Sequence, residues 1–263
     1  IQNLVNRALA LRKKSHHLYK QAEKLLLKEI RIDKLELAKK KIYEARFSKV
    51  IEHRRFDAEY YKPEYKEIIE ILKKSGFELR RLKDAVKVSD KTLDPSQEPH
   101  KKFRYIELAN VSPSTGEITN YGEVIGYKAP SRARMLLKKG DVLVSSLSGS
   151  LDNIALVPEE LDGSVGSTGF FVINSDEFYS EFLFLLFRSV LIKRQLEQKA
   201  AGTIMAAVTR KDFENLLIPR VPKQKQLEIS NLITESFKVL KEGKRLIDTA
   251  KIEVERLVSS FGQ

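Results

Sequence analysis

The chain has 263 residues, of which 42% are hydrophobic, so it can bury a core as one large domain or two small ones. Lys and Arg total 48 against 36 Asp and Glu, which gives a formal net charge of +12. The absence of cysteine excludes disulfides, Cys-containing zinc sites, iron–sulfur clusters and thiol catalysis. The longest apolar run, FLFLLF at 182–187, falls well short of the ~20 residues of a membrane span, so we expect a soluble, cytoplasmic protein.

The first expected element is a long N-terminal helix. Large apolar residues recur every seven positions from Leu4 to Ile32, and small residues occupy a second column that starts at Ala8. A seven-residue repeat places both columns on one side of a helix, where they can form a seam with another helix. Because residues 1–62 contain neither Pro nor Gly, we expect this helix to be long, either straight or kinked near Ile32.

A domain of mixed α and β structure is expected over residues 53–222. Here the sequence changes to short runs rich in Val, Ile and Phe, separated by turn residues, which is typical of strands. The expected strands are KFRYIELANV (102–111), GDVLVSSL (140–147), NIALVP (153–158) and GFFVIN (169–174). The expected helices cover 63–76 and 180–200. We interpret GSVGSTG (163–169), which lacks the glycine spacing of a dinucleotide-binding loop, as a turn between strands.

The C-terminal helix, expected over residues 223–263, repeats the N-terminal one. When the N-terminal segment is shifted by 228 residues, Ile1 falls on Ile229 and Leu4 on Leu232. We therefore expect an antiparallel coiled-coil pair, in which small residues let the two backbones approach. The alternative is two ordinary amphipathic helices, each covering a core. The predicted interface comprises Leu4, Ala8, Leu11, Ser15, Leu18 and Ala22 from the first helix and Leu232, Ser236, Val239, Gly243, Leu246 and Ala250 from the second.

Positive charge is unevenly distributed along the chain. Residues 1–52 hold 14 basic and 6 acidic residues, and residues 80–139 hold 13 and 7. A basic balance of this size indicates nucleic acid, an acidic partner or an anionic membrane surface. The alternative is a lysine-rich protein without such a partner. We interpret 80–139 as the cationic face of the middle domain, and the excess in 1–52 as serving either an acidic partner or DNA.

No motif in the sequence is interpreted as catalytic or metal-binding. The patterns GxxxxGK[ST], HExxH and GxSxG are absent, as is the Asn/Asp-Pro-Pro-aromatic tetrapeptide of amino-methyltransferases. The four histidines, His16, His17, His53 and His100, are scattered, and neighbours on a helix point in different directions. We therefore expect no cofactor, no metal site and no enzymatic activity of the chain alone.

Three segments resemble the DNA-specificity subunit of type I restriction–modification systems. They are RFDAEYYKPEY (55–65), LKKGDVLVSSLSGSLDNIALVPEELDG (137–163) and RKDFENLLIPRVPKQKQLEISNLI (210–233). The most specific part is the closing motif from Ile218 to Gln226, whose two prolines end a strand and begin a helix. The segments 148–153 and 200–203 depart from the family's pattern, so individual DNA contacts do not transfer.

The resemblance implies an α+β target-recognition domain between two conserved helices, which pair antiparallel, space the recognition domains and dock methyltransferase subunits. The family's full order is domain, helix, domain, helix. This chain resembles the C-terminal half, with a helical segment at 1–52, a recognition domain at 53–222 and a second conserved helix at 223–263. It is expected to be either a piece of a longer subunit, because Ile1 already lies within a helix, or a natural half-subunit that pairs as a homodimer.

The expected function is sequence-specific recognition of double-stranded DNA, which directs methyltransferase subunits, and through them the restriction subunit, to a target half-site. Basic side chains would fix the register on phosphates, and polar loop side chains would read base edges. The predicted DNA-contacting residues are Lys91, Lys101, Lys102, Arg104, Arg132, Arg134, Ser148, Thr203, Arg210 and Lys211. The alternatives are a helix-mediated assembly adaptor that reads no bases, and an enzyme fragment, for which the chain lacks a motif.

Overall fold

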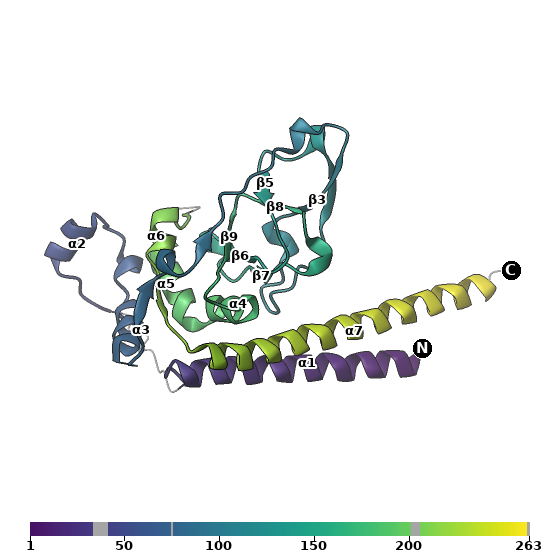
Figure 1. The fold of residues 1–263 in the computed structure, drawn as a ribbon, viewed down its shortest axis with the longest axis horizontal. Helices are drawn as coiled ribbons and strands as arrows, with labels where there is room; N and C mark the ends of the chain where they lie inside the picture. The colour runs from purple at the N-terminus through teal and green to yellow at the C-terminus, as the bar shows by residue number, and fades with distance from the viewer. Residues whose placement is uncertain (34–41, 75, 201–205, 262–263) are drawn as a thin grey trace.

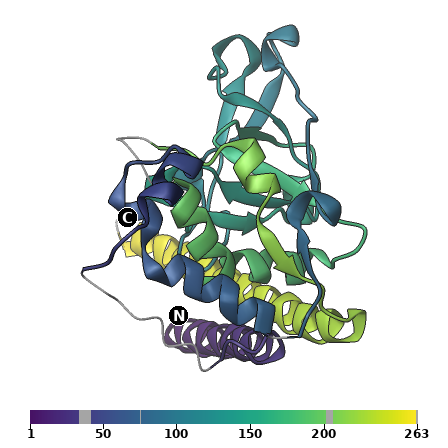
Figure 2. The same cartoon turned by 90° about the vertical axis from the view of Figure 1, so that its left-hand side faces the viewer.

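The computed structural model describes residues 1–33, 42–74, 76–200 and 206–261. Two long helices, one at each end of the chain, lie side by side, and a mixed α+β domain packs mainly on the C-terminal helix and also on the last turns of the N-terminal one (Figures 1 and 2). The predicted fold class, an α+β domain flanked by a pair of long helices, is confirmed by this arrangement.

Helix α1 (Gln2–Glu29) is shorter than the sequence predicted. Arg31 adopts a positive φ of 58°, and the N–H groups of Arg31 and Ile32 donate to carbonyls three and five residues earlier. This is the Schellman arrangement, which usually employs glycine, so the lack of glycine did not prevent the helix from ending. The expected continuation past Ile32 is wrong, because Ile30 and Ile32 turn into the core, where they are 0% and 3% exposed.

Helix α7 (Lys223–Phe261) runs antiparallel to α1. The amino group of Ile1 lies 3.5 Å from the carboxylate of Glu253, near the far end of α7. At the middle of the pair, the hydroxyls of Ser15 and Ser236 are 3.1 Å apart, and Ser236 Oγ also donates to the Ser15 carbonyl at 2.9 Å. The predicted antiparallel pairing is therefore confirmed.

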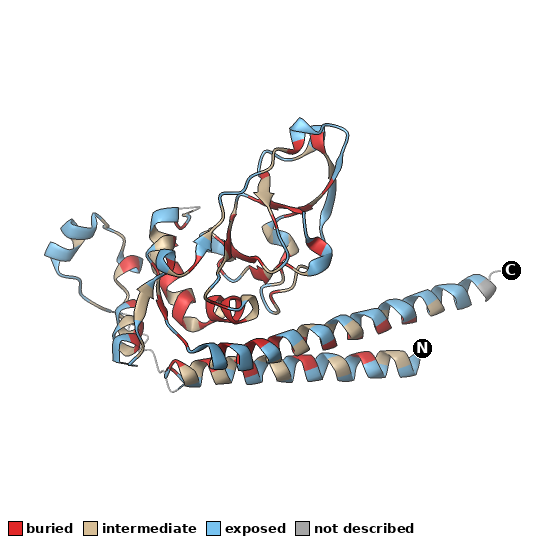
Figure 3. Cartoon of the chain, in the orientation of Figure 1, coloured by how far each residue is buried: buried red, intermediate tan, exposed pale blue. Residues whose placement is uncertain are grey.

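The small residues of the seam allow a close approach of the two helices. A side-chain carbon at Gly243 would lie 3.3 Å from the Ala8 carbonyl oxygen and 3.4 Å from Leu11 Cβ. All twelve predicted seam residues are buried or partly buried. The column does not continue to Leu257, which is 49% exposed, because α7 extends past the start of α1 (Figure 3).

Between α1 and α7, the described residues form five further α-helices. They are α2 (Phe47–His53), α3 (Pro63–Lys74), α4 (Ser180–Arg188), α5 (Val190–Ala200) and α6 (Arg210–Glu214). The expected single helix over 180–200 is two helices, because Ser189 is extended, with ψ 155°. Its hydroxyl donates to the Leu186 carbonyl at 2.6 Å, the local side-chain bonding by which serine competes with helix continuation.

Within the described residues, ten strands form three sheets. They are β1 (Leu79–Arg81), β2 (Lys87–Val88), β3 (Lys102–Ile106), β4 (Gly122–Ile125), β5 (Ala133–Leu136), β6 (Val142–Ser145), β7 (Ile154–Leu156), β8 (Val165–Ser167), β9 (Phe170–Asn174) and β10 (Leu217–Pro219). A two-stranded sheet pairs β1 with β10. The proximal sheet has the order β2-β9-β6-β7, and the distal sheet has the order β4-β3-β8-β5. Among these described strands, β3 and β8 pair in parallel and every other pair is antiparallel.

The proximal sheet is covered on both faces. One face, with Val142, Val144 and Ile173, joins the main core formed with α1, α3, α4, α5 and α7. The other face, with Leu143 and Val172, packs toward the distal sheet. Successive residues of β6 therefore point to opposite faces and are all buried, which explains why its first three residues are all apolar.

The glycine-containing segment 163–169 was interpreted as a turn, and this interpretation is wrong. Its centre is β8, which lies inside the distal sheet between β3 and β5. A side-chain carbon at Gly166 would lie 2.9 Å from Leu137 Cδ2, so glycine allows the strand to pack against Leu137. The turn itself is the two-residue connection, Thr168 and Gly169, to β9.

The closing motif joins the domain to α7. Strand β10 ends at Pro219, and α7 begins directly after Pro222. Gln226, which is 1% exposed, donates to the Val221 carbonyl at 2.8 Å and accepts from the backbone N–H of Tyr179 at 3.3 Å. The motif thus fixes the first turn of α7 against the start of α4.

Replacing Gln226 with Ala is expected to lower the free energy of unfolding by about 1–3 kcal/mol, since a buried carbonyl and N–H would lose their partner. The matched control is Gln224→Ala, because Gln224 is an exposed glutamine of the same helical turn. Chemical denaturation of both variants measures the difference. Equal midpoints for the two would show that the Gln226 amide does not stabilise this junction.

Candidate nucleic-acid interface

Five of the predicted DNA-contacting cations follow one extended segment of the middle domain. This segment, residues 88–94, runs from α6 to the edge strand β5 of the distal sheet. At one end, Arg210 donates to the Val88 carbonyl at 3.2 Å. At the other, the backbone N–H of Leu93 donates to the Arg134 carbonyl at 2.8 Å. We call these five cations the basic track: Lys91, Arg132, Arg134, Arg210 and Lys211.

Two members of the basic track are held by acidic partners. Arg210 pairs with Asp90 and, at 2.7 Å, with Glu214, and hydrogen bonds to these carboxylates raise the pKa of Arg210. Arg134 lies 3.5 Å from Asp94. The hydrogen bonds from Ser96 lower the pKa of Asp94, so this carboxylate remains ionised beside the guanidinium. These pairs position the two arginines and partly neutralise them.

The other three members, Lys91, Arg132 and Lys211, are exposed, and their side chains have no hydrogen bond or ion pair within the described ranges. An exposed cation that forms no ion pair can exchange its counterion for a phosphate without breaking an existing pair. The electrostatics of the track therefore favour these three as phosphate contacts.

The remaining predicted cations lie on or beside β3, which β8 separates from β5. Arg104 donates to the carbonyls of Glu160 and, at 2.8 Å, of Asp162, so its guanidinium ties β3 to a neighbouring turn. Lys101 pairs with Glu98 at 2.8 Å, and Lys102 lies 3.9 Å from Glu123. The structure thus divides the six predicted contact cations of 80–139 equally: three lie on the basic track and three in this second group.

The two predicted polar contacts are Ser148 and Thr203. Ser148 lies on the short helix η6 (Ser148–Ser150), where it is exposed and its backbone N–H donates to the Ala206 carbonyl at 2.9 Å. The η6 turn is therefore joined to the segment that precedes α6. Thr203 lies outside the described residues.

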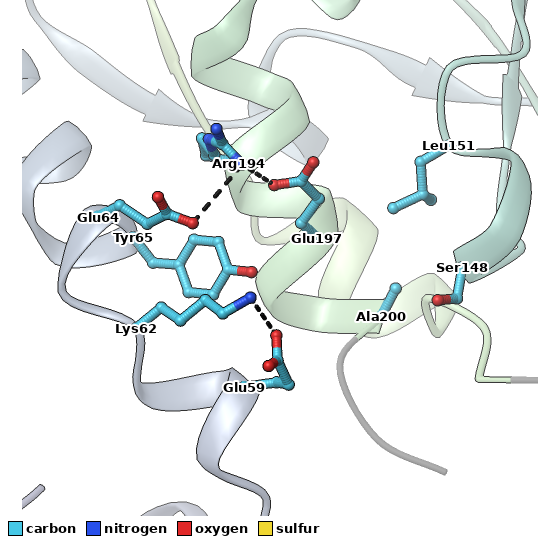
Figure 4. A pocket seen from close by; sticks show the side chains of 9 residues that line it. All are labelled: Glu59, Lys62, Glu64, Tyr65, Ser148, Leu151, Arg194, Glu197 and Ala200. Carbon is cyan, nitrogen blue, oxygen red and sulfur yellow. Dashed lines mark hydrogen bonds and ion pairs between the residues drawn. The ribbon is translucent and has the colours of Figure 1, made fainter. Parts of the chain in front are cut away.

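A pocket of about 320 Å³ lies between η6, helix α5 and the segment 59–65. Figure 4 shows that its charged side chains face one another, with Arg194 between Glu64 (3.6 Å) and Glu197 (2.6 Å). Burial raises the pKa of Tyr65 in its wall to about 12. The lining includes a third carboxylate, Glu59, which pairs with a lysine.

The lining carries three carboxylates against two cations, so the pocket repels phosphate rather than binding it. All five charged side chains of the lining form ion pairs, and the pair between Glu64 and Arg194 joins the segment 59–65 to α5. It offers no nucleophile beside a general base, which acyl or phosphoryl transfer would require. In the described part of the chain, no cluster of His, Asp or Glu could hold a metal ion. Among the same residues, no helix is both long and apolar enough to cross a membrane.

The charge pattern of the sequence predicted cationic contacts, but it gave no sign of the exposed aromatic side chains near the distal sheet. Tyr121 and Tyr127 are 45% and 58% exposed. The available signal was the position of Tyr127 between a glycine and a lysine in a turn, where an aromatic side chain has no core to enter. Gln226 is a further residue of interest, and the burial of its side chain follows from its place in the closing motif.

The fold and the basic track together define a class: an α+β domain with a cationic edge, mounted on an antiparallel helix pair. The family described as type I restriction modification DNA specificity domain matches residues 74–248. This covers more than half of the chain, which therefore belongs to that family. No curated protein matches the chain.

Solved structures agree with this assignment. The HsdS subunit from Thermoanaerobacter tengcongensis is 36% identical, with a TM-score of 0.55 over 70% of this chain and 48% of that one. A structure described as the basis of complex assembly and conformational transition of the type I R-M system gives 34% identity, a TM-score of 0.55 and the same coverage. The S subunit from M. genitalium is 14% identical, covers 97% of this chain and 56% of that one, and shares the fold with a TM-score of 0.52. The chain spans about half the length of these proteins.

Proposed function

We propose that the chain recognises one half of a DNA target site and presents it to methyltransferase subunits, which perform the chemistry. The observation that carries this proposal is the basic track, an array of cations on a domain whose family is defined by DNA specificity. Phosphate contacts along the track would fix the register, and neighbouring loops would read bases. We infer that the chain alone is not catalytic, because the pocket and the track offer no reactive constellation.

The helix pair is the proposed docking site for the methyltransferase subunits. Lys13, Lys24 and Lys28 are exposed on α1, and each lies two positions from a buried residue, about 200° around the helix. They therefore face away from α7, and α1 itself lies on the side of α7 opposite the sheets (Figure 1). A cationic face turned away from the recognition domain fits an acidic protein surface better than the DNA bound by that domain.

The end of α7 supports pairing with a second recognition domain, in a longer chain or in a second copy. Beyond the start of α1, this helix exposes Ile252, Val254 and Val258 by 49%, 43% and 67%. Under the 228-residue repeat, Val254 and Val258 correspond to Leu26 and Ile30 of α1, which are fully buried against this chain's own domain. The equivalent face of α7 has no such cover here.

Selection from a pool of random duplexes tests the proposed function against its alternatives. The purified chain is expected to enrich one short sequence and to return every duplex unmodified when S-adenosylmethionine is present. Uniform, salt-sensitive binding without enrichment would support the assembly adaptor instead. Methylated or cleaved DNA from the chain alone would show that it is an enzyme.

A further inference from the structure

The distal lobe, which carries β3 and β5, ends in a tip that points away from the helix pair (Figure 1). Two single-turn helices form this tip, η3 (Pro95–Gln97) and η5 (Gly126–Lys128), and they pack on each other. A side-chain carbon at Gly126 would overlap the carbonyl oxygens of Pro95 and Glu98. The close packing of the two turns therefore requires glycine at this position.

Hydrogen bonds fix the backbone of the tip. The N–H of Gly126 donates to the Lys101 carbonyl at 3.0 Å, and the N–H of Tyr127 donates to the Pro99 carbonyl at 3.1 Å. On the opposite turn, Asp94 accepts from the Ser96 N–H at 3.0 Å and caps η3. These hydrogen bonds hold the tip backbone in one conformation, which fixes the positions from which its side chains project.

The aromatic ring at the tip is exposed and lies near a lysine and a histidine. Tyr127 is 58% exposed. The ammonium of Lys128 lies 5.4 Å from the centre of its ring, and the imidazole of His100 lies 6.5 Å from it. No other large apolar side chain is exposed among the described residues of the tip, so the ring does not belong to an apolar patch of the kind that protein partners cover.

We propose that Tyr127 contacts the bases of the DNA target, with its ring packed on a base while Lys128 binds a flanking phosphate. An exposed ring on a fixed loop beside a cation matches the chemistry by which proteins stack on or wedge against bases. The tip lies beyond Arg132, at the far end of the basic track, so a duplex bound along the track would reach it. This inference rests on the proposed recognition of DNA and assigns a base-contacting residue to it.

The test compares Tyr127→Ala and Tyr127→Phe with the unaltered chain, on its enriched duplex and a scrambled one. Tyr127→Ala is expected to weaken binding to the enriched duplex about tenfold to a hundredfold, with the salt dependence unchanged, because no charge is lost. Tyr127→Phe keeps the ring and is expected to bind like the unaltered chain. Tyr121→Ala is the matched control, since Tyr121 is an exposed tyrosine of the same lobe for which no cation–ring contact is found.

Thermal melting shows whether each variant is folded, and the exposed position of Tyr127 predicts unchanged melting. A Tyr127→Ala variant that binds the enriched duplex as tightly as the unaltered chain would overturn the inference and leave the proposed function standing. An unaltered chain that prefers no duplex over another would instead contradict the proposed function, and the role of Tyr127 would fall with it.

Discussion

Replacing Ala8 and Ala22 together with Leu is expected to lower the free energy of unfolding by about 2–6 kcal/mol, which is about 1–3 kcal/mol at each site. Both alanines are buried in the seam, at 3% and 0% exposure, and the backbone of α7 is close to α1 at Gly243. Three added carbons at each site cannot be accommodated unless the helices move apart. For a chain of this size, the melting temperature should fall by about 5–20 °C.

The control for this pair of substitutions is Ala10→Leu. Ala10 is exposed on the same helix, so the same chemical change adds no atoms to the seam and is expected to alter stability by less than about 0.5 kcal/mol. Calorimetry or denaturant titration of the three proteins decides the question. If the double variant and the Ala10→Leu control have the same melting temperature, the small residues do not form a close interface.

Replacing Lys91, Arg132 and Lys211 together with Ala is expected to weaken binding to every duplex by a similar factor. The side chains of these cations form no ion pair or hydrogen bond among the described residues, and phosphates carry no sequence information. If each contacts one phosphate, the slope of log affinity against log salt should flatten by nearly three units, at ~0.9 per contact. Titrations at several salt concentrations, on an enriched and a scrambled duplex, measure this slope.

A second triple variant, Lys13, Lys24 and Lys28 to Ala, removes the same charge from the outer face of α1. It is expected to leave the salt slope unchanged, because α1 lies at the opposite end of the molecule from the distal sheet (Figure 2). The comparison decides between the two roles that the sequence allowed for the charge of residues 1–52. A flattened slope in the α1 variant, with an unchanged slope in the track variant, would place the DNA against the helix pair.

The helix pair could be predicted from the sequence because its signal is local and repeated. A heptad of large and small residues fixes which side of each helix is buried, and the 228-residue repeat predicts that the two sides match. The ends of the helices were less predictable. Arg31 takes a left-handed conformation that glycine usually supplies, and the serine that separates α4 from α5 is common inside helices.

The sheets were harder to predict because their pairing joins distant segments. Strand β8 contains Gly166 and Ser167, so its composition indicated a turn, whereas the strand lies between β3 and β5 and packs Gly166 closely against Leu137. The charge pattern had a similar limit. The sequence gives every arginine the same weight, but Arg104 bonds to carbonyls while Arg132 has no such bond in the described structure. Only three-dimensional contacts separate structural cations from free ones.

The central claim, that this chain reads a DNA sequence, is tested most directly by the affinity of the purified chain for its enriched duplex relative to a scrambled duplex at physiological salt. A half-site in which several base pairs are changed should bind at least about a hundredfold more weakly, since each mismatched pair costs ~1–3 kcal/mol. Equal affinity for the two duplexes, with both showing the same salt dependence, would contradict sequence recognition and leave only electrostatic binding.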